Sequence, residues 1–156
     1  MSGVSHSDED RCVGWREYIA LPDLETGVMR AKFDTGARTS AIGVMGLTTR
    51  IGADGRRWAF FELRPRIKAR VIQCSAPLVD ERDVRDASGA ESARLFIETR
   101  LVLGADCWSI ELGLAQRETM RFPMLIGRRG MRGICVDPAG GYLRGPPDMR
   151  RVPEIQ

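Results

Sequence analysis

The chain has 156 residues, of which 43% are hydrophobic, and a formal net charge of +3. This length and composition predict one compact domain whose core needs neither a metal ion nor a disulfide to hold it together. The first eleven residues are polar and contain no apolar run, which excludes a signal peptide or a transmembrane segment in that stretch. We therefore expect a disordered tail over residues 1–11 and a cytoplasmic protein that does not contact a membrane.

The cysteines and the basic residues fit this expectation. Cys12, Cys74, Cys107 and Cys135 lie far apart in sequence and form no Cys-x-x-Cys pair, which favours buried thiols over disulfides. The positive charge is almost entirely arginine, which pairs with carboxylates or phosphates through two hydrogen bonds at once. Most arginines are expected on solvated strand faces, whereas residues 64–70 are either a basic hairpin turn or a contact site for RNA or an acidic partner.

Short strands separated by Gly and Asp turns are predicted along most of the chain. The expected strands cover residues 16–21, 28–33, 39–44, 47–51, 57–63, 69–74, 95–103, 107–114 and 134–136. The turns at residues 22–27 and 104–106 join their neighbouring strands into hairpins. This pattern predicts an all-β domain over residues 12–145, closed or sandwiched, with at most a short helix.

Three segments depart from the strand pattern. Residues 79–91 are charged and rich in turn formers, so we expect an exposed loop, either a solvated connection or part of a lid over a cleft. Residues 128–133 are expected to form a short turn or a helical turn. Residues 146–156 contain several prolines and are expected to be a flexible C-terminal tail.

Two short stretches carry the chemistry of the chain. The strand at residues 28–33 is followed by Asp34, Thr35 and Gly36, an acid, a hydroxyl and a glycine in a tight loop. By itself this triplet also fits an ordinary turn. The second stretch, residues 124–128, is an apolar run that ends in Gly127 and Arg128.

Together the two stretches resemble the retropepsin-like aspartic peptidases, in which an apolar-apolar-Gly element packs beside the catalytic loop. Residues 13–17, 31–40, 77–85 and 121–128 are similar to one bacterial branch of that family, which carries the label "ATP-dependent zinc protease" and is linked with ATP-grasp ligases that add glutamates to a ribosomal protein. The resemblance implies a retropepsin-like acid-protease barrel. It also implies catalytic residues Asp34, Thr35 and Gly36 and substrate-binding residues Ala37, Arg38, Ile126, Gly127 and Arg128.

An aspartic peptidase needs two carboxylates around one water molecule, and like charges so close share one proton. The chain has one Asp-Thr-Gly and no Asp-Ser-Gly. We therefore expect a homodimer in which each subunit contributes Asp34. The other acids in turn contexts are interpreted as turn residues; they are Asp23, Asp54, Asp106 and Asp137.

No metal site and no cofactor are predicted. His6 is the only histidine, and zinc enzymes of the usual kind need histidines or clustered cysteines. Residues 127–130 lack the Gly-Lys-Ser/Thr ending of a phosphate-binding loop, so ATP dependence finds no support. Without a histidine base in the domain, a serine or cysteine nucleophile is also set aside.

Two functions stay open at this point. One is an aspartic endopeptidase that acts on acidic or glutamate-tailed proteins. The other is a catalytically silent module that binds peptides in the same cleft and works with an ATP-grasp ligase, the ribosome or a ribosomal protein. Arg38 and Arg128 make the cleft positive unless structural partners neutralise them, and the candidate partners are Asp80, Glu81 and Asp137.

Overall fold

The computed structural model describes residues 11–85, 88–116 and 122–153. Its strands are β1 (Cys12–Gly14), β2 (Arg16–Ala20), β3 (Val28–Phe33), β4 (Ser40–Gly43), β5 (Met45–Ile51), β6 (Arg57–Leu63), β7 (Ile72–Arg85), β8 (Glu91–Leu103), β9 (Asp106–Ala115), β10 (Met124–Ile126) and β11 (Cys135–Asp137). Between and after the strands lie three short 3-10 helices, η2 (Pro22–Leu24), η3 (Arg128–Gly130) and η4 (Met149–Arg151). The prediction of an all-β fold with short strands and at most short helices is confirmed.

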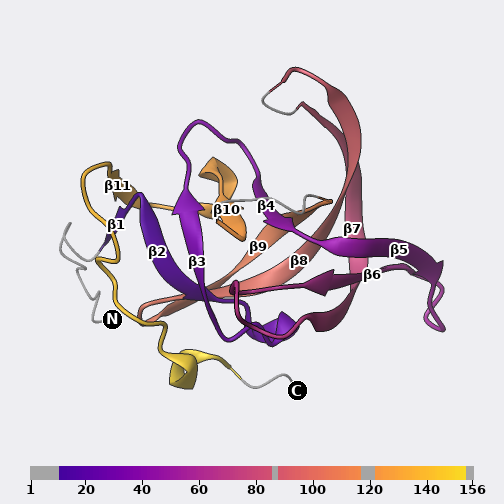
Figure 1. Cartoon of the computed structure of the whole chain (residues 1–156), viewed down its shortest axis with the longest axis horizontal. Coiled ribbons are helices and arrows are strands. Elements are labelled where there is room, and N and C mark those ends of the chain that lie inside the picture. The colour runs from indigo at the N-terminus through magenta and orange to yellow at the C-terminus, as the bar shows by residue number, and fades with distance from the viewer. Residues whose placement is uncertain (1–10, 86–87, 117–121, 154–156) are drawn as a thin grey trace, which may run out of the picture.

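The strands form a barrel from which a sheet extends (Figure 1). Neighbouring strands pair in the order β2, β3, β10, β4, β9 and β8, and the pairing of Ala20 with Val102 joins β2 back to β8. Strands β7, β6 and β5 continue the sheet beyond β8. No helix in the described part of the chain is long and apolar enough to cross a membrane.

Alternation of side chains places the apolar residues inside. Along β3, Met29, Ala31 and Phe33 are buried while the residues between them are exposed, as expected for a strand with one face on the core. The largest fully buried side chains come from strands around the barrel and from the sheet that extends from it, and they include Ile19, Phe61, Phe96, Leu112 and Met124. Burial of this surface is the main force that stabilises the fold.

Strand β10 lies between β3 and β4. It runs parallel to β3, with Met124 opposite Ala31, and antiparallel to β4, with Met124 opposite Ile42. Because β3 and β4 are consecutive in sequence, the loop that joins them must pass over the end of β10. That loop contains Asp34, so the fold brings the two sequence motifs to the same place.

The expectation of an exposed loop over residues 79–91 is wrong. Strand β7 runs to Arg85 and β8 begins at Glu91, and the two strands pair from Leu78 opposite Ile97 to the end of the hairpin. Figure 1 shows this hairpin rising away from the other strands. Most of its residues beyond Leu78 are at least partly exposed, so the sequence lacks the apolar alternation that marks a half-buried strand. Residues 86–87 lie outside the described residues.

A buried carboxylate fastens the C-terminal segment to the barrel. Glu17 is fully buried, and its two oxygens accept hydrogen bonds from the backbone N–H groups of Gly14 (2.7 Å), Leu143 (2.9 Å) and Arg144 (2.9 Å). The N–H of Tyr142 donates to the carbonyl of Arg16 (2.9 Å). A charged acceptor shared by three backbone donors is a strong and direction-specific contact.

The structure describes most of the predicted C-terminal tail but only the last residue of the predicted N-terminal tail. Residues 1–10 and 154–156 lie outside the described residues. The N–H of Asp148 donates to the carbonyl of Gly104 (2.7 Å), and Arg100 donates to the carbonyl of Pro153 (2.6 Å). Residues 146–153 therefore contact the β8–β9 hairpin, and the flexibility expected of this segment stays a prediction.

Replacement of Glu17 by alanine should destabilise the protein strongly, because three buried or partly buried backbone N–H donors would lose their acceptor. We expect the free energy of unfolding, measured by urea denaturation, to fall by about 3 to 5 kcal/mol. The control Glu98→Ala, at an exposed position on β8, should change it by less than about 0.5 kcal/mol. Equal effects of the two substitutions would contradict this role for Glu17.

Candidate active site

Asp34 follows β3 directly and sits at the start of a tight turn. Its backbone N–H donates to the carbonyl of Ile126 (2.9 Å), and its own carbonyl accepts from the N–H of Ala37 (3.1 Å). Its carboxylate oxygen Oδ1 accepts from the N–H of Gly36 (2.9 Å), and the side chain is half-buried. The carboxylate is therefore held in one orientation while one side of it stays accessible.

Backbone contacts lock this loop against the segment that follows β10. The N–H of Arg128 donates to the carbonyl of Ala37 (2.8 Å), and the N–H of Arg129 donates to the carbonyl of Arg38 (3.1 Å). A Cβ atom on Gly127 would lie 2.5 Å from the carbonyl oxygen of Thr39. Such an approach is closer than any side chain permits, so glycine is required at this position.

Two further residues support the loop, and the sequence analysis missed both. The buried hydroxyl of Ser40 accepts from the N–H of Gly127 (3.2 Å). The indole of Trp108 on β9 donates to the carbonyl of Gly130 (3.0 Å). Ser40 stands six positions after Asp34, which is a weak signal, whereas nothing in the local sequence of β9 links Trp108 to the loop.

The side chain of Arg128 belongs to the scaffold of the loop. Its guanidinium donates to the carbonyl of Thr35 (2.9 Å). The acids expected as partners of the site arginines point elsewhere, because Asp80 pairs with Arg82, Glu81 pairs with Arg57, and Asp137 accepts from the N–H of Ala139. Arg128 is thus engaged by a backbone carbonyl, and no carboxylate among the described residues pairs with it.

The remaining predicted residues have different exposures. Ile126 and Gly127 are buried, and their backbone contacts hold the Asp34 loop in place. Thr35 and Gly36 are exposed, and the Thr35 hydroxyl makes no hydrogen bond to any residue that the structure describes. Ala37 is half-buried and lines the pocket beside the loop.

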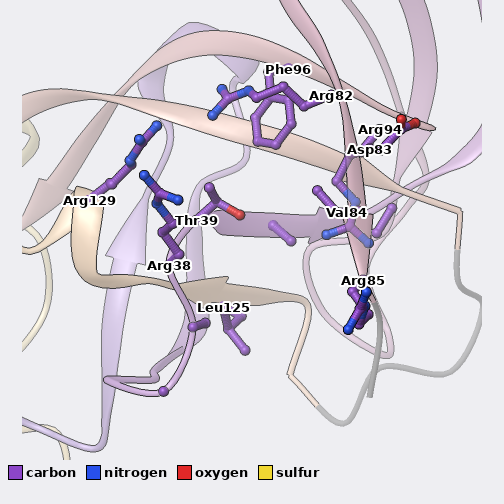
Figure 2. Close-up of a pocket in the computed structure, with 14 residues that line it drawn as sticks. Arg38, Thr39, Arg82, Asp83, Val84, Arg85, Arg94, Phe96, Leu125 and Arg129 are labelled. Atoms are coloured by element: carbon purple, nitrogen blue, oxygen red, sulfur yellow. The ribbon is translucent and has the colours of Figure 1, made fainter. Parts of the chain in front are cut away.

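An open pocket of about 670 Å³ lies between the loop and the β7–β8 hairpin (Figure 2). The loop after Asp34 forms one side of it and the hairpin forms another. Its lining comprises Gly36, Ala37, Arg38, Thr39, Ala41, Arg82, Asp83, Val84, Arg85, Arg94, Phe96, Ala115, Leu125 and Arg129. The β7–β8 hairpin covers the segment that the sequence analysis interpreted as either a solvated connection or part of a lid. This hairpin contributes directly to the pocket.

The pocket is rich in arginine, but its arginines differ in their partners. Arg82 pairs with Asp80 and Glu111 and lies over the ring of Phe96, whereas Arg85 pairs with Glu91. Arg38 and Arg129 are exposed and form no ion pair with any residue in the described ranges. Figure 2 shows these two side chains next to each other at one side of the pocket. Arg129 was not predicted, although it follows Gly127-Arg128 directly.

The described ranges contain no cluster of side chains that would support metal binding. No group of three or more His, Cys, Asp or Glu side chains there is placed to hold an ion. The acids of the turns have structural partners instead, as Asp54 accepts from the N–H of Arg56 (3.0 Å) and from the indole of Trp58. These two contacts hold the pKa of the Asp54 carboxyl below its usual value.

The barrel, the inserted strand β10 and the Asp-Thr-Gly loop define the retropepsin class of fold. Residues 12–147 match the family described as "Retropepsin-like aspartic endopeptidase RimB", and the chain belongs to this RimB-like family. A solved structure of similar fold is that of Lpg0085 from Legionella pneumophila, a protein described as having unknown function. It has a TM-score of 0.72 and 22% sequence identity, over 85% of this chain and 97% of that one.

Longer proteins contain a region similar to this chain. A "Probable alpha-L-glutamate ligase" from Desulfotalea psychrophila is 37% identical over 139 residues, and one from Parasynechococcus marenigrum is 37% identical over 142 residues. The matches cover 87% and 89% of this chain. The chain spans about 30% of the length of each of these relatives.

The requirement for Gly127 gives a direct test of the loop geometry. Gly127→Ala should force the Asp34 loop away from β10, because the new Cβ would overlap the backbone of Thr39 in that loop. We expect the free energy of unfolding to fall by about 2 to 3 kcal/mol in urea denaturation. Gly36→Ala is the matched comparison, since its Cβ would meet only the Asp34 carboxylate at 3.1 Å, and it should cost less. The reverse order would contradict the packing described here.

Proposed function

We propose that this protein is an aspartic endopeptidase that is active as a homodimer. The observation that carries the proposal is the single Asp34 carboxylate, held by the N–H of Gly36 on a loop that is itself locked against the β10 segment. Membership of a family described as aspartic endopeptidases supports the same chemistry. One subunit provides half of the required pair of carboxylates, so a second copy must provide the other half.

In the proposed mechanism the two Asp34 carboxylates share one proton and hold one water molecule between them. The ionised carboxylate takes a proton from the water, which attacks the peptide carbonyl, while the protonated carboxyl donates a hydrogen bond to the carbonyl oxygen. The proton then passes to the departing amine as the C–N bond breaks. The hydrogen bonds of the loop keep each carboxylate oriented throughout, which lowers the cost of reaching the transition state.

We further propose that the substrate is acidic, with a glutamate-rich or glutamate-tailed protein as the favoured class. Arg38 and Arg129 line the pocket and form no ion pair within the described ranges, so their guanidinium groups are available to substrate carboxylates. The similarity to proteins named glutamate ligases agrees with a glutamate-related substrate.

A second candidate function rests on those same relatives. A region like this chain makes up about 30% of proteins that are named as ligases. This favours a catalytically silent module that holds an acidic peptide for an ATP-grasp ligase or on a ribosomal protein. The two functions differ in whether the Asp34 carboxylate is needed for the biological effect, and the following experiment separates them.

Asp34→Asn should abolish cleavage of glutamate-tailed peptides while leaving the fold and the dimer intact. Peptide products would be measured by mass spectrometry and the dimer by sedimentation equilibrium. After subunit exchange, mixing wild type with an equal amount of the variant should lower the activity per wild-type chain to roughly one half, because mixed dimers carry one carboxylate. Wild-type activity should survive a metal chelator.

Several results would count against this proposal. Undiminished activity in the mixture would indicate a complete site in one subunit, and loss of activity with chelator followed by recovery with zinc would indicate metal chemistry. Peptide binding without any cleavage by the wild-type dimer would favour the silent module.

The charge of the pocket gives a separate prediction about binding. The inactive Asp34→Asn protein should bind a glutamate-rich peptide more tightly than a matched glutamine peptide, and the difference should shrink as salt rises. Adding Arg38→Ala or Arg129→Ala should each weaken binding of the acidic peptide by about 1.5 to 3 kcal/mol, measured by calorimetry. Arg56→Ala, at an exposed position in the β5–β6 turn outside the pocket, is the control and should have no effect. Equal affinities for the two peptides would remove the support for a basic pocket.

A further inference from the structure

Two cysteines that are 123 positions apart in sequence lie opposite each other in the small sheet formed by β1 and β11. The strands run parallel, and their register pairs Cys12 with Cys135 and Val13 with Val136. Side chains alternate along a strand, so the two cysteines share one face and the two valines share the other. Val13 is fully buried, Cys12 is half-buried and Cys135 is exposed, which places the cysteines on the outer face.

The backbone spacing at this pair suits a disulfide. Neighbouring strands lie about 4.8 Å apart, and the Cα atoms of disulfide partners are usually about 4.4 to 6.8 Å apart. Directly paired positions therefore have a Cα spacing in this range, and closing the bond needs rotation of the two side chains and a Cβ spacing of about 3.5 to 4.5 Å. No disulfide joins Cys12 and Cys135 in this structure, so the pair is present in its dithiol form.

The other two cysteines have environments that suppress reactivity. Cys74 is buried in the core, and burial raises the pKa of its thiol to about 11. Burial also raises the pKa of the Cys107 thiol. Because the thiolate is the reactive form, both should stay unreactive at neutral pH. Cys135, by contrast, is exposed to small molecules in solution.

We propose that Cys12 and Cys135 are a reversible thiol–disulfide site that fastens β1 to β11. In the reaction, the Cys135 thiolate attacks one sulfur of a small-molecule disulfide and releases the first small thiolate. The Cys12 thiolate then attacks the Cys135 sulfur of this mixed disulfide and releases the second. Two protein thiols are oxidised and one small disulfide is reduced to two thiols, and excess reducing thiol reverses both steps.

A disulfide between Cys12 and Cys135 would affect the candidate active site, because both strands connect to segments beside the Asp34 loop. Strand β1 leads to Trp15, whose carbonyl accepts from the N–H of Phe33 (2.8 Å), the residue before Asp34. Strand β11 follows η3, which carries Arg128 and Arg129 beside the Asp34 loop. A covalent bond between the strands would therefore link the two segments that flank the loop and stabilise their contact.

Peptide mapping of the purified full chain tests the proposal. After incubation with oxidised glutathione, remaining thiols are blocked with N-ethylmaleimide and the protein is cut with trypsin without reduction. We expect the peptides of residues 12–16 and 133–144 to be joined, and to separate on treatment with dithiothreitol. The same oxidation should raise the Tm by about 5 to 15 °C.

Variants separate this bond from other oxidation products. Cys12→Ser and Cys135→Ser should each abolish both the joined peptide and the rise in Tm, whereas the double variant Cys74→Ser/Cys107→Ser should keep both. Non-reducing electrophoresis should show the oxidised protein as a single chain. Glutathione attached to Cys135 without a joined peptide, a bond between two chains, or a rise in Tm that persists in Cys12→Ser would overturn the proposal.

Discussion

The insertion of β10 between β3 and β4 is the constraint on which the site depends. All three residues of β10, Met124–Ile126, pair with β3 and the first two also pair with β4, so the ends of the Asp34 loop are fixed on either side of one short strand. The residue that follows, Gly127, lies against the backbone of Thr39 in space that no side chain could share. The position of the loop that carries the candidate catalytic carboxylate thus depends on this glycine.

Local sequence patterns predicted much of this fold because they report on single strands and turns. Strand β3 alternates fully, and the expected bounds, residues 28–33, agree with the structure. The hairpin around Gly104 was also predicted, from the two alternating runs on either side of the turn, and in the structure this glycine has a φ of +55°. The pair of motifs around Asp34 and Gly127 indicated the family through the resemblance, and the fold places the two motifs side by side.

The features that the sequence did not predict depend on contacts between distant segments. The contact of Trp108 with Gly130 joins positions that no local pattern connects. The long β7–β8 hairpin was missed because charged pairs such as Arg85 with Glu91 replace the apolar alternation of a buried strand. The sequence predicts the positive charge of Arg128 but not where its side chain points. In the structure its guanidinium donates to a backbone carbonyl.

The many arginines of this chain serve two different purposes. Arg100 donates to both oxygens of Asp23, which holds η2 against β8 and keeps the pKa of that carboxyl below its usual value. Similar pairs, such as Arg144 with Asp106, use a guanidinium to hold segments together. Arg38 and Arg129 differ, because they face an open pocket and form no ion pair with residues in the described ranges.

The hydrogen bonds that Glu17 accepts from the C-terminal segment also constrain the order in which the chain can fold. Its acceptor oxygens lie near the start of the chain, while two of its donors, the N–H groups of Leu143 and Arg144, are 126 and 127 positions later. A chain that leaves the ribosome from its N-terminus cannot make these contacts until Leu143 and Arg144 have been synthesised. The pairing of β3 with β10 is delayed for the same reason, since such distant contacts must wait for the loop between them to close. The contacts that hold the Asp34 loop therefore cannot form before residues 124–129 have been synthesised.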